Sequence, residues 1–126
     1  MKNHNQTVGK IGEQKAAIYL KNHGYKIEER NYRSKSGEID IIAKKDEMLI
    51  FAEVKTRMQG IYGSPAEAVN FRKRKNITET ALCYLMKNCL DCPCRFDIIE
   101  VVMKKNVFGY NAAINHIENA FYQDFH

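Results

Sequence analysis

The sequence has few of the residues that interrupt or repeat structure. Only two prolines and seven glycines occur among 126 residues, and no internal repeat or linker-like segment is present. This scarcity excludes collagen-like and low-complexity chains, and a hydrophobic content of 44% argues against disorder. A chain of this length buries roughly two-thirds of its unfolded surface when it folds. We therefore expect residues 1–126 to form a single domain.

Long apolar runs are also absent. Residues 1–10 are polar, and no segment reaches the length of a signal-peptide core or a membrane span. The sequence therefore predicts a cytoplasmic protein with no membrane partner.

The cysteines lack the context of a disulfide framework, since they have no nearby histidine and no secretory signal. They are Cys83, Cys89, Cys92 and Cys94. Four thiolates are enough for a zinc or iron–sulfur site, but the spacing fits no paired C-x2-C template. Ordinary reduced thiols are favoured, and a metal site stays open as the alternative.

Acidic residues are outnumbered in one part of the chain. The protein has 20 Lys and Arg against 15 Asp and Glu, a net charge of +5. Residues 1–75 hold 16 of these basic residues and 9 of the acidic ones, whereas the rest has a small acidic excess. Clustered basic side chains release counterions from phosphates, which suits a polyanionic partner. On charge alone, a solvated basic surface is the simpler interpretation.

The apolar pattern predicts an α/β fold. The expected elements are a helix from 8 that stops at Gly24, strands over 25–32, 38–43 and 48–55, a helix from 64 to about 85 interrupted near Asn70, and a strand over 96–102. The second helix starts at a capping sequence over 64–67. Residues 112–121 fit either a strand or a short helix. Because the second helix can act as a crossover, we expect an α-β-β-β-α-β sandwich with a mixed sheet.

Charged residues interrupt the two strands of the predicted hairpin. Alternate residues of a strand share a face, so Glu53 and Lys55 point the same way. With a two-residue loop at 46–47, Asp40 lies opposite Glu53, with Cβ atoms about 4.5–5.5 Å apart. A register shift of one residue would separate them. Two close carboxylates repel unless a cation or proton lies between them, so this pair predicts a divalent-metal site.

A structural alternative exists for each of these residues. Asp40, Glu53 and Lys55 could form cross-strand ion pairs on a solvent-facing sheet. Apolar residues such as Phe51 share that face, however, and charges within an apolar face are costly unless paired or functional, which favours function. Glu13 lies beside small and apolar residues of the first helix. It either points toward the same cation, or makes a salt bridge or reaches water.

Basic residues flank the acidic strands on both sides. Residues 72–75 are all basic, and Arg30, Arg33 and Lys35 precede the first acidic strand. Both groups could border one cleft and hold a phosphate backbone. Taken singly, each charge run is more commonly a solvated surface.

Several short strings of residues together resemble a known bacterial family. They are Gly12-Glu13, Asn31-Tyr32-Arg33, the segments 37–43 and 51–57, and Tyr62-Gly63-Ser64-Pro65 with Ala68-Val69. Over roughly residues 8–102 the chain closely resembles the YraN family, which is grouped with the PD-(D/E)xK nuclease superfamily. That family looks similar to archaeal Holliday-junction resolvases. The resemblance implies a restriction-endonuclease-like sandwich and a nuclease-like domain.

The superfamily pattern consists of an acid on the second core strand, acid-x-Lys on the third, and an upstream glutamate on a helix. Asp40 matches the first acid, Glu53-Val54-Lys55 matches acid-x-Lys, and Glu13 matches the helical glutamate. The proline that usually precedes the first acid is Ile39 here. That position is the least constrained part of the pattern.

The resemblance implies a Mg²⁺- or Mn²⁺-dependent endonuclease that hydrolyses DNA phosphodiester bonds. Asp40, Glu53 and the Val54 carbonyl would hold the ion, which polarises the phosphate and activates a water. Lys55 would orient or help deprotonate that water and stabilise negative charge, and Glu13 would complete the metal shell or bind a second ion. The candidate DNA-backbone contacts are Arg33, Arg57, Arg72, Lys73 and Lys75.

The substrate and the assembly state are less constrained by the residues. Branched or junction DNA in repair or recombination fits the resemblance, and a symmetric homodimer would let two sites cut two strands. The alternative to an enzyme is a non-catalytic nucleic-acid-binding module, or an accessory subunit of a DNA-processing complex. Such a module would bind DNA in a salt-sensitive way that survives loss of the acids.

Overall fold

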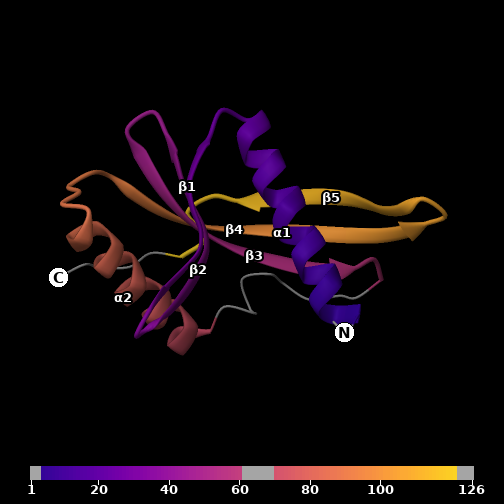
Figure 1. Ribbon diagram of the computed structural model, residues 1–126, viewed down its shortest axis with the longest axis horizontal. Helices are drawn as coiled ribbons and strands as arrows, with labels where there is room; N and C mark the ends of the chain where they lie inside the picture. Colours follow the sequence, from indigo (N-terminus) through magenta and orange to yellow (C-terminus); the bar gives the residue numbers. More distant parts are fainter. Residues whose placement is uncertain (1–3, 61–69, 122–126) are drawn as a thin grey trace.

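Five strands form one mixed sheet with two helices packed against it (Figure 1). The computed structural model describes residues 4–60 and 70–121. Its elements are α1 (His4–Asn22), β1 (Lys26–Ser34), β2 (Gly37–Lys45), β3 (Met48–Met58), α2 (Phe71–Lys87), β4 (Cys94–Asn106) and β5 (Gly109–Ile117). The sheet order is β1-β2-β3-β4-β5, and only β3 and β4 are parallel neighbours. The predicted α/β class is confirmed, and the arrangement is consistent with a restriction-endonuclease-like fold.

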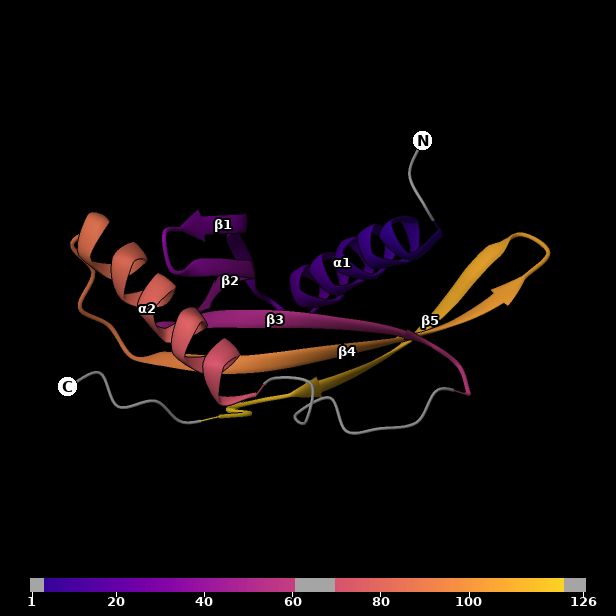
Figure 2. The ribbon, with the colours of Figure 1, turned by 90° about the horizontal axis from the view of Figure 1, so that it is seen from below.

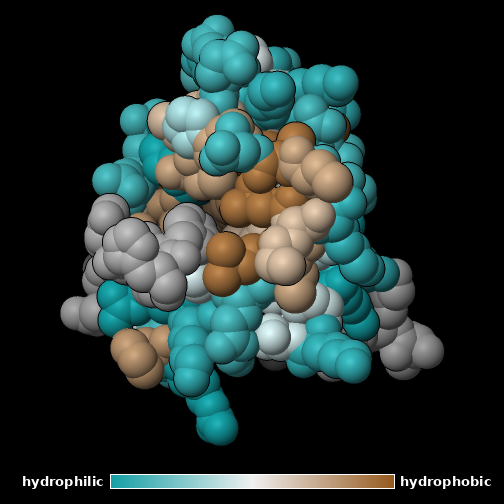
Figure 3. Space-filling model, turned by 90° about the vertical axis from the view of Figure 1, so that its left-hand side faces the viewer, coloured by the Kyte–Doolittle hydropathy of each residue, from teal (hydrophilic) through white to brown (hydrophobic). Residues whose placement is uncertain are grey.

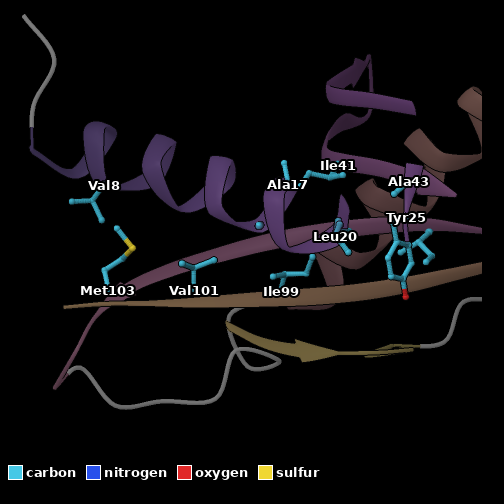
Figure 4. Close-up of a cluster of buried hydrophobic side chains, with 12 residues drawn as sticks. Val8, Ala17, Leu20, Tyr25, Ile41, Ala43, Ile99, Val101 and Met103 are labelled. Carbon is cyan, nitrogen blue, oxygen red and sulfur yellow. The ribbon is translucent and has the colours of Figure 1, made fainter. Parts of the chain in front are cut away.

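The two helices cover opposite faces of the sheet (Figures 1 and 2). Along β3, Ile50 and Ala52 pack into the cluster that contains Leu20 of α1 (Figure 4). The alternate residues Leu49 and Phe51 pack into the cluster that contains α2. A strand covered on both faces is apolar at successive positions, which explains the nearly continuous run over 48–52. Each fully buried aliphatic side chain contributes about 1.5–3 kcal/mol.

The predicted hairpin between β2 and β3 is present. Its loop is Asp46-Glu47, and its register pairs Ile42 with Phe51, both as expected. Asp46 has a φ of 54°, a left-handed conformation that aspartate tolerates better than most residues. The first helix also ends as expected, because Gly24, two residues after the last residue of α1, adopts a φ of 87°.

The remaining elements differ in detail from the sequence prediction. The capping sequence over 64–67 lies outside the described residues. The described helix begins at Phe71, and Asn70 caps it by accepting a hydrogen bond from the Lys73 amide at 2.9 Å. The segment 112–121, left open between strand and helix, contributes most of β5. This fifth strand extends the predicted order to α-β-β-β-α-β-β.

Exposed apolar side chains occur at several places on the described surface, among them Ile18 on α1 and Phe71 at the start of α2. The β4–β5 hairpin extends beyond the end of β3, and Val107 and Phe108 at its tip are exposed (Figure 2). At the end of the molecule where α2 lies, apolar side chains gather in the middle of the surface with hydrophilic ones around them (Figure 3). Met86 and Leu90, at and just after the end of α2, are also exposed. Within 4–60 and 70–121, no helix combines the length and apolarity needed to cross a bilayer.

The four cysteines form no disulfide. Cys83 and Cys89 are exposed, and Cys92 and Cys94 are partly buried. Burial, together with the neighbouring Cys92, raises the pKa of the Cys94 thiol to about 11, so this thiol is protonated at neutral pH. The described part of the chain contains no cluster of three or more Cys, His, Asp or Glu residues that could hold a metal ion.

Candidate functional site

The ladder between β2 and β3 ends just before the two acids. Its last pair is Ile41 with Ala52, one step short of the predicted pairing of Asp40 with Glu53. Beyond this point β2 no longer forms ladder pairs with β3. Asp40 Oδ2 accepts a hydrogen bond from the Val54 amide at 2.8 Å. The first acid is thereby fixed against the acid-x-Lys segment by a side-chain contact with the backbone.

The strand β2 changes the face it presents at Asp40. Ile39 packs into the α2 cluster and Ile41 into the α1 cluster, although residues two apart on a regular strand share a face. Across the hairpin, Asn31 lies opposite Asp40, because its neighbours on β1 pair with Ile41 and Ile39. Asn31 has a φ of 54°, which is uncommon for a residue within a strand. The distortion of both strands is therefore centred on the acid.

Asn31 also links two further carboxylates to this point. In the amide orientation that satisfies its contacts, its side-chain nitrogen donates to Glu38 Oε1 at 3.0 Å and to Glu13 Oε1 at 3.1 Å. Glu13 belongs to α1 and Glu38 to β2. A single amide thus connects the helical glutamate to the strand that carries Asp40.

A close approach of α1 to β3 brings Glu13 over the site. A Cβ atom added at Gly12 would overlap the side chain of Thr56. Only glycine fits at this contact, and Glu13 is the next residue on the helix. The packing of α1 therefore determines where the helical glutamate lies.

These residues surround two adjoining cavities. The larger, of about 660 Å³, is lined by Gly9, Lys10, Glu13, Asp40, Glu53, Val54, Lys55 and Thr56. The second, of about 300 Å³, is lined by Gly37, Glu38, Asp40, Glu53, Lys73, Asn76 and Ile77. Asp40 and Glu53 line both cavities. The structure thus brings together all four residues expected to be catalytic, from α1, β2 and β3, with Lys73 of α2 on the other side.

Two lysines neutralise the buried glutamate. Lys73 Nζ lies 2.8 Å from Glu53 Oε1, and Lys55 Nζ lies 3.9 Å from the same oxygen. The Glu53 side chain is 9% exposed, whereas that of Lys73 is 37% exposed. Burial and the proximity of Lys73 lower the pKa of Lys55. Burial also acts to lower the pKa of Lys73, but its contact with Glu53 outweighs this effect and raises it.

Asp40 has no comparable cationic partner. Burial and the repulsion from Glu53 raise its pKa to about 7, against the lowering effect of the Val54 amide. Glu13 adds to the repulsion. Ionised Asp40 therefore lies beside negative charge that is not fully compensated, and the addition of a cation would relieve this repulsion.

The donor set at this position is small but suits a hard divalent ion. Among the described residues, no group of three or more His, Cys, Asp or Glu side chains is close enough to hold a metal ion. Mg²⁺ commonly takes only one or two carboxylates and completes its shell with water and substrate phosphates. Asp40 and Glu53 provide two carboxylates beside Val54, and the excess negative charge fits a cation. These residues therefore fit Mg²⁺ or Mn²⁺.

The other basic candidates lie outside both cavities. Arg33 pairs with Glu38 at 3.3 Å, and Arg57 pairs with Glu100 at 2.8 Å. Arg72 and Lys75 are exposed on α2. Of the five predicted backbone contacts, Lys73 lines the second of these two cavities and the other four line neither.

Sequence reasoning missed three features of the site. Lys73 was assigned only to the DNA backbone, because a run of four basic residues does not reveal which one turns inward. The roles of Asn31 and of the Gly12–Thr56 contact were also missed. Gly12 and Asn31 both belong to strings that carry the family resemblance, so those strings contained the available signal.

The fold and the site define a mixed α/β domain with an acidic pair, an acid-x-Lys segment and a helical glutamate around one cavity. Residues 12–101 match the uncharacterised protein family UPF0102, and the chain belongs to this family. It is the family identified from the sequence as YraN.

Full-length relatives support this membership. A UPF0102 protein of Clostridium botulinum strain 657 is 50% identical over 119 residues, which cover 93% of this chain and 95% of the relative. A UPF0102 protein of Alkaliphilus oremlandii is 47% identical over 120 residues, covering 93% and 99% of the two chains. The similarity thus extends over nearly the whole length of each protein.

Proposed function

We propose that this protein is a Mg²⁺- or Mn²⁺-dependent endonuclease of the PD-(D/E)xK superfamily that cuts DNA in the cytoplasm. The observation that carries the proposal is the meeting of Asp40, Glu53 and Lys55 at one cavity, with the Asp40 pKa raised to about 7 by burial and by Glu53. A carboxyl group with a strongly raised pKa in a cleft, as at Asp40, is more typical of a functional site than of a structural ion pair.

Each residue of the site has a chemical role in this proposal. Asp40 and Glu53 hold the ion, with Val54 beside them. When bound, the ion supplies Lewis-acid polarisation of the phosphate and a more acidic water. Lys55 orients the attacking water and stabilises the negative charge that develops on the phosphate oxygens. Glu13, held by Asn31, faces the same cavity and orients water or a second ion.

The substrate side of the proposal rests on the basic surface. Arg72 and Lys75 are exposed on α2, the helix whose Lys73 lines the second cavity. Phosphate contacts of this kind position a duplex without reading its sequence. We include branched and junction DNA among the substrates, with a homodimer as the assembly that would cut two strands.

One observation favours a second function, a nucleic-acid-binding module without turnover. Lys73 lies 2.8 Å from Glu53, so the buried glutamate has a cationic partner without a metal ion. A module of this kind would use the basic surface for DNA binding. It would need neither Asp40 nor a divalent ion.

A combined metal-binding and cleavage assay separates the two functions. Mg²⁺ and Mn²⁺ would be titrated into the wild type and into Asp40→Ala, Glu53→Ala, Lys55→Ala and Lys87→Ala by calorimetry. Cleavage of duplex and four-way-junction DNA would be measured in parallel. We expect Asp40→Ala and Glu53→Ala to lose both metal binding and cleavage. Lys55→Ala should keep the metal and lose at least about a hundredfold in cleavage rate.

The Lys87→Ala variant is the matched control, because Lys87 is an exposed cation in the last turn of α2 and lines neither cavity. It should cleave at a rate within a few-fold of the wild type. Retained cleavage in all three site variants would overturn the enzymatic proposal. Salt-sensitive DNA binding without cleavage in any protein would favour the binding module.

A further inference from the structure

Lys73 pairs with a carboxylate that a divalent ion at this site would need. Its Nζ atom is 2.8 Å from Glu53 Oε1, a charge-assisted hydrogen bond of ordinary length. Lys55 Nζ is 3.9 Å from the same oxygen. A divalent ion bound to this carboxylate would add a third cationic centre beside one buried acid. The three positive charges repel one another, so the ion and Lys73 compete.

We propose that Lys73 serves two anions in turn. It pairs with Glu53 when no metal is bound, and a divalent ion displaces it toward the phosphate backbone of the substrate. This inference rests on the proposed function, because it assumes that the ion binds at Asp40 and Glu53. In this proposal Lys73 is a positioning residue, and metal binding increases the affinity for DNA by releasing it.

The position of Lys73 on α2 permits this exchange. It lies in the first turn of the helix, where its backbone amide is fixed by the Asn70 cap. Its side chain has a flexible four-carbon stem and is 37% exposed, so the ammonium can leave Glu53 without unfolding the helix. Arg72 and Lys75 on the same helix are exposed. A released Lys73 would therefore join an existing basic surface.

The charge balance of the site argues against a purely structural ion pair. If the Lys73–Glu53 pair had only a structural role, we would expect the nearby carboxylates to be compensated as well. Among the described residues, however, Asp40 accepts a hydrogen bond only from the Val54 amide. Arg57 and Glu100 provide a contrast within the same sheet. They pair at 2.8 Å and line neither cavity, as expected of a pair that only stabilises the fold.

The first test is the metal affinity of variants that remove one cation each. Mg²⁺ and Mn²⁺ would be titrated by calorimetry at pH 8 into the wild type, Lys73→Met, Lys73→Arg and Lys10→Met. We expect Lys73→Met to bind the ion about tenfold more tightly, because its competitor is gone. Lys73→Arg should stay close to the wild type, since it keeps the competing charge.

Lys10→Met is the matched control for charge near the site. Lys10 lines the larger cavity but is exposed, and no ion pair joins it to Glu53 in the described residues. Its removal should change the metal affinity less than about twofold, because an exposed charge is screened by salt. Equal affinities of Lys73→Met and the wild type would overturn the inference alone. Binding in none of the proteins would overturn both the inference and the proposed metal site, whereas binding only by Lys73→Met would support competition.

The second test follows Lys73 to the DNA. Binding of a fluorescent 20-base-pair duplex would be measured in EDTA and in Ca²⁺, which takes oxygen ligands as Mg²⁺ does. We expect Lys73→Met to weaken binding about fivefold in Ca²⁺ and less than twofold in EDTA. Lys75→Met should weaken it equally in both. A Lys73→Met effect that is equal in the two conditions, or absent from both, would overturn the exchange between two anions.

Discussion

Two aspartates of the sheet, Asp97 fully buried and Asp40 partly buried, have opposite surroundings. Asp97 on β4 is fully buried and accepts four hydrogen bonds, two from Arg95, one from His116 at 2.7 Å and one from the Asn119 amide. Burial acts to raise its pKa, but these donors outweigh burial and lower it. Asp40 accepts one described hydrogen bond, faces two other carboxylates, and has a pKa raised to about 7 by burial and by Glu53.

The difference separates an acid that holds the fold together from one that is available for chemistry. The donors of Asp97 come from β4, from β5 and from the chain just after β5, and His116 Nδ1 lies 3.0 Å from the Tyr19 hydroxyl of α1. This network connects α1 to the strands β4 and β5. Asp40 lacks such partners, and excess negative charge of that kind is what a bound cation can neutralise. Burial acts to raise the pKa of both acids, so the number of hydrogen-bond donors is what distinguishes the two roles.

The largest expected effect is the loss of stability when Asp97 is removed. Asp97→Ala leaves Arg95 and His116 without their shared acceptor, and breaking a buried ion pair from one side typically costs about 3–5 kcal/mol. We expect the free energy of unfolding to fall by this amount in urea titrations followed by circular dichroism at pH 7.5.

Asp40→Ala is the control for this comparison. It removes a carboxylate of the same type from the same sheet, but one that is repelled by its neighbours. We expect it to leave the free energy of unfolding within about 1 kcal/mol of the wild type. Equal losses in the two variants would contradict the distinction between the two acids.

Much of the fold was accessible from the sequence because the relevant signals are local. The two-residue loop at 46–47 and the alternation of residues along β3 were enough to give the register of the hairpin up to Ile42 and Phe51. Gly24 marked the end of α1. The fifth strand was left open because residues 112–121 alternate too weakly to exclude a helix. Its strand conformation depends on pairing with β4, which is a tertiary contact.

The site was only partly accessible for the same reason. The acid-x-Lys spacing placed Glu53 and Lys55 on one face, which is a property of any strand. The change of face at Asp40 depends on the conformation of Asn31 across the hairpin, and the inward direction of Lys73 depends on how α2 packs. The Asp97 network was not predicted at all. Except for Arg95 and Asp97, its members are distant in sequence, and no local pattern connects Tyr19 with His116.

An effect of intermediate size is expected in the pH dependence of the free energy of unfolding, which should differ between Asp40 and Asp97. The folded pKa of Asp40 is about 7, above the ordinary value of 3.8, so the folded protein pays a penalty for its ionisation. This penalty is absent near pH 4, develops between pH 4 and 7, and is complete above pH 7. The free energy of unfolding of Asp40→Asn should therefore exceed that of the wild type by at least about 1 kcal/mol at pH 8 in EDTA, and should equal it at pH 4.

The contribution of Asp97 to stability depends on pH in the opposite direction. Because its folded pKa is lowered, its contribution to stability is complete above its unfolded pKa and is lost as the pH falls through the folded value. Urea unfolding curves of Asp40→Asn and Asp97→Asn at several pH values would measure both slopes. A gain for Asp40→Asn that is the same at pH 4 and pH 8 would contradict the raised pKa.

The smallest expected effect tests the outer end of the Asp97 network. With His116 protonated at Nε2, its ring donates to Asp97 and accepts a hydrogen bond from the Tyr19 hydroxyl. Burial raises the pKa of Tyr19, so the hydroxyl keeps its proton at neutral pH. Tyr19→Phe removes this one bond and should cost about 1 kcal/mol in urea unfolding. Tyr110→Phe, for which the described residues provide no hydrogen-bond partner, should stay within about 0.5 kcal/mol of the wild type. Neither variant should change Mg²⁺ affinity, and a change in Tyr19→Phe would mean that the two acidic clusters are coupled through α1, the helix that carries both Tyr19 and Glu13.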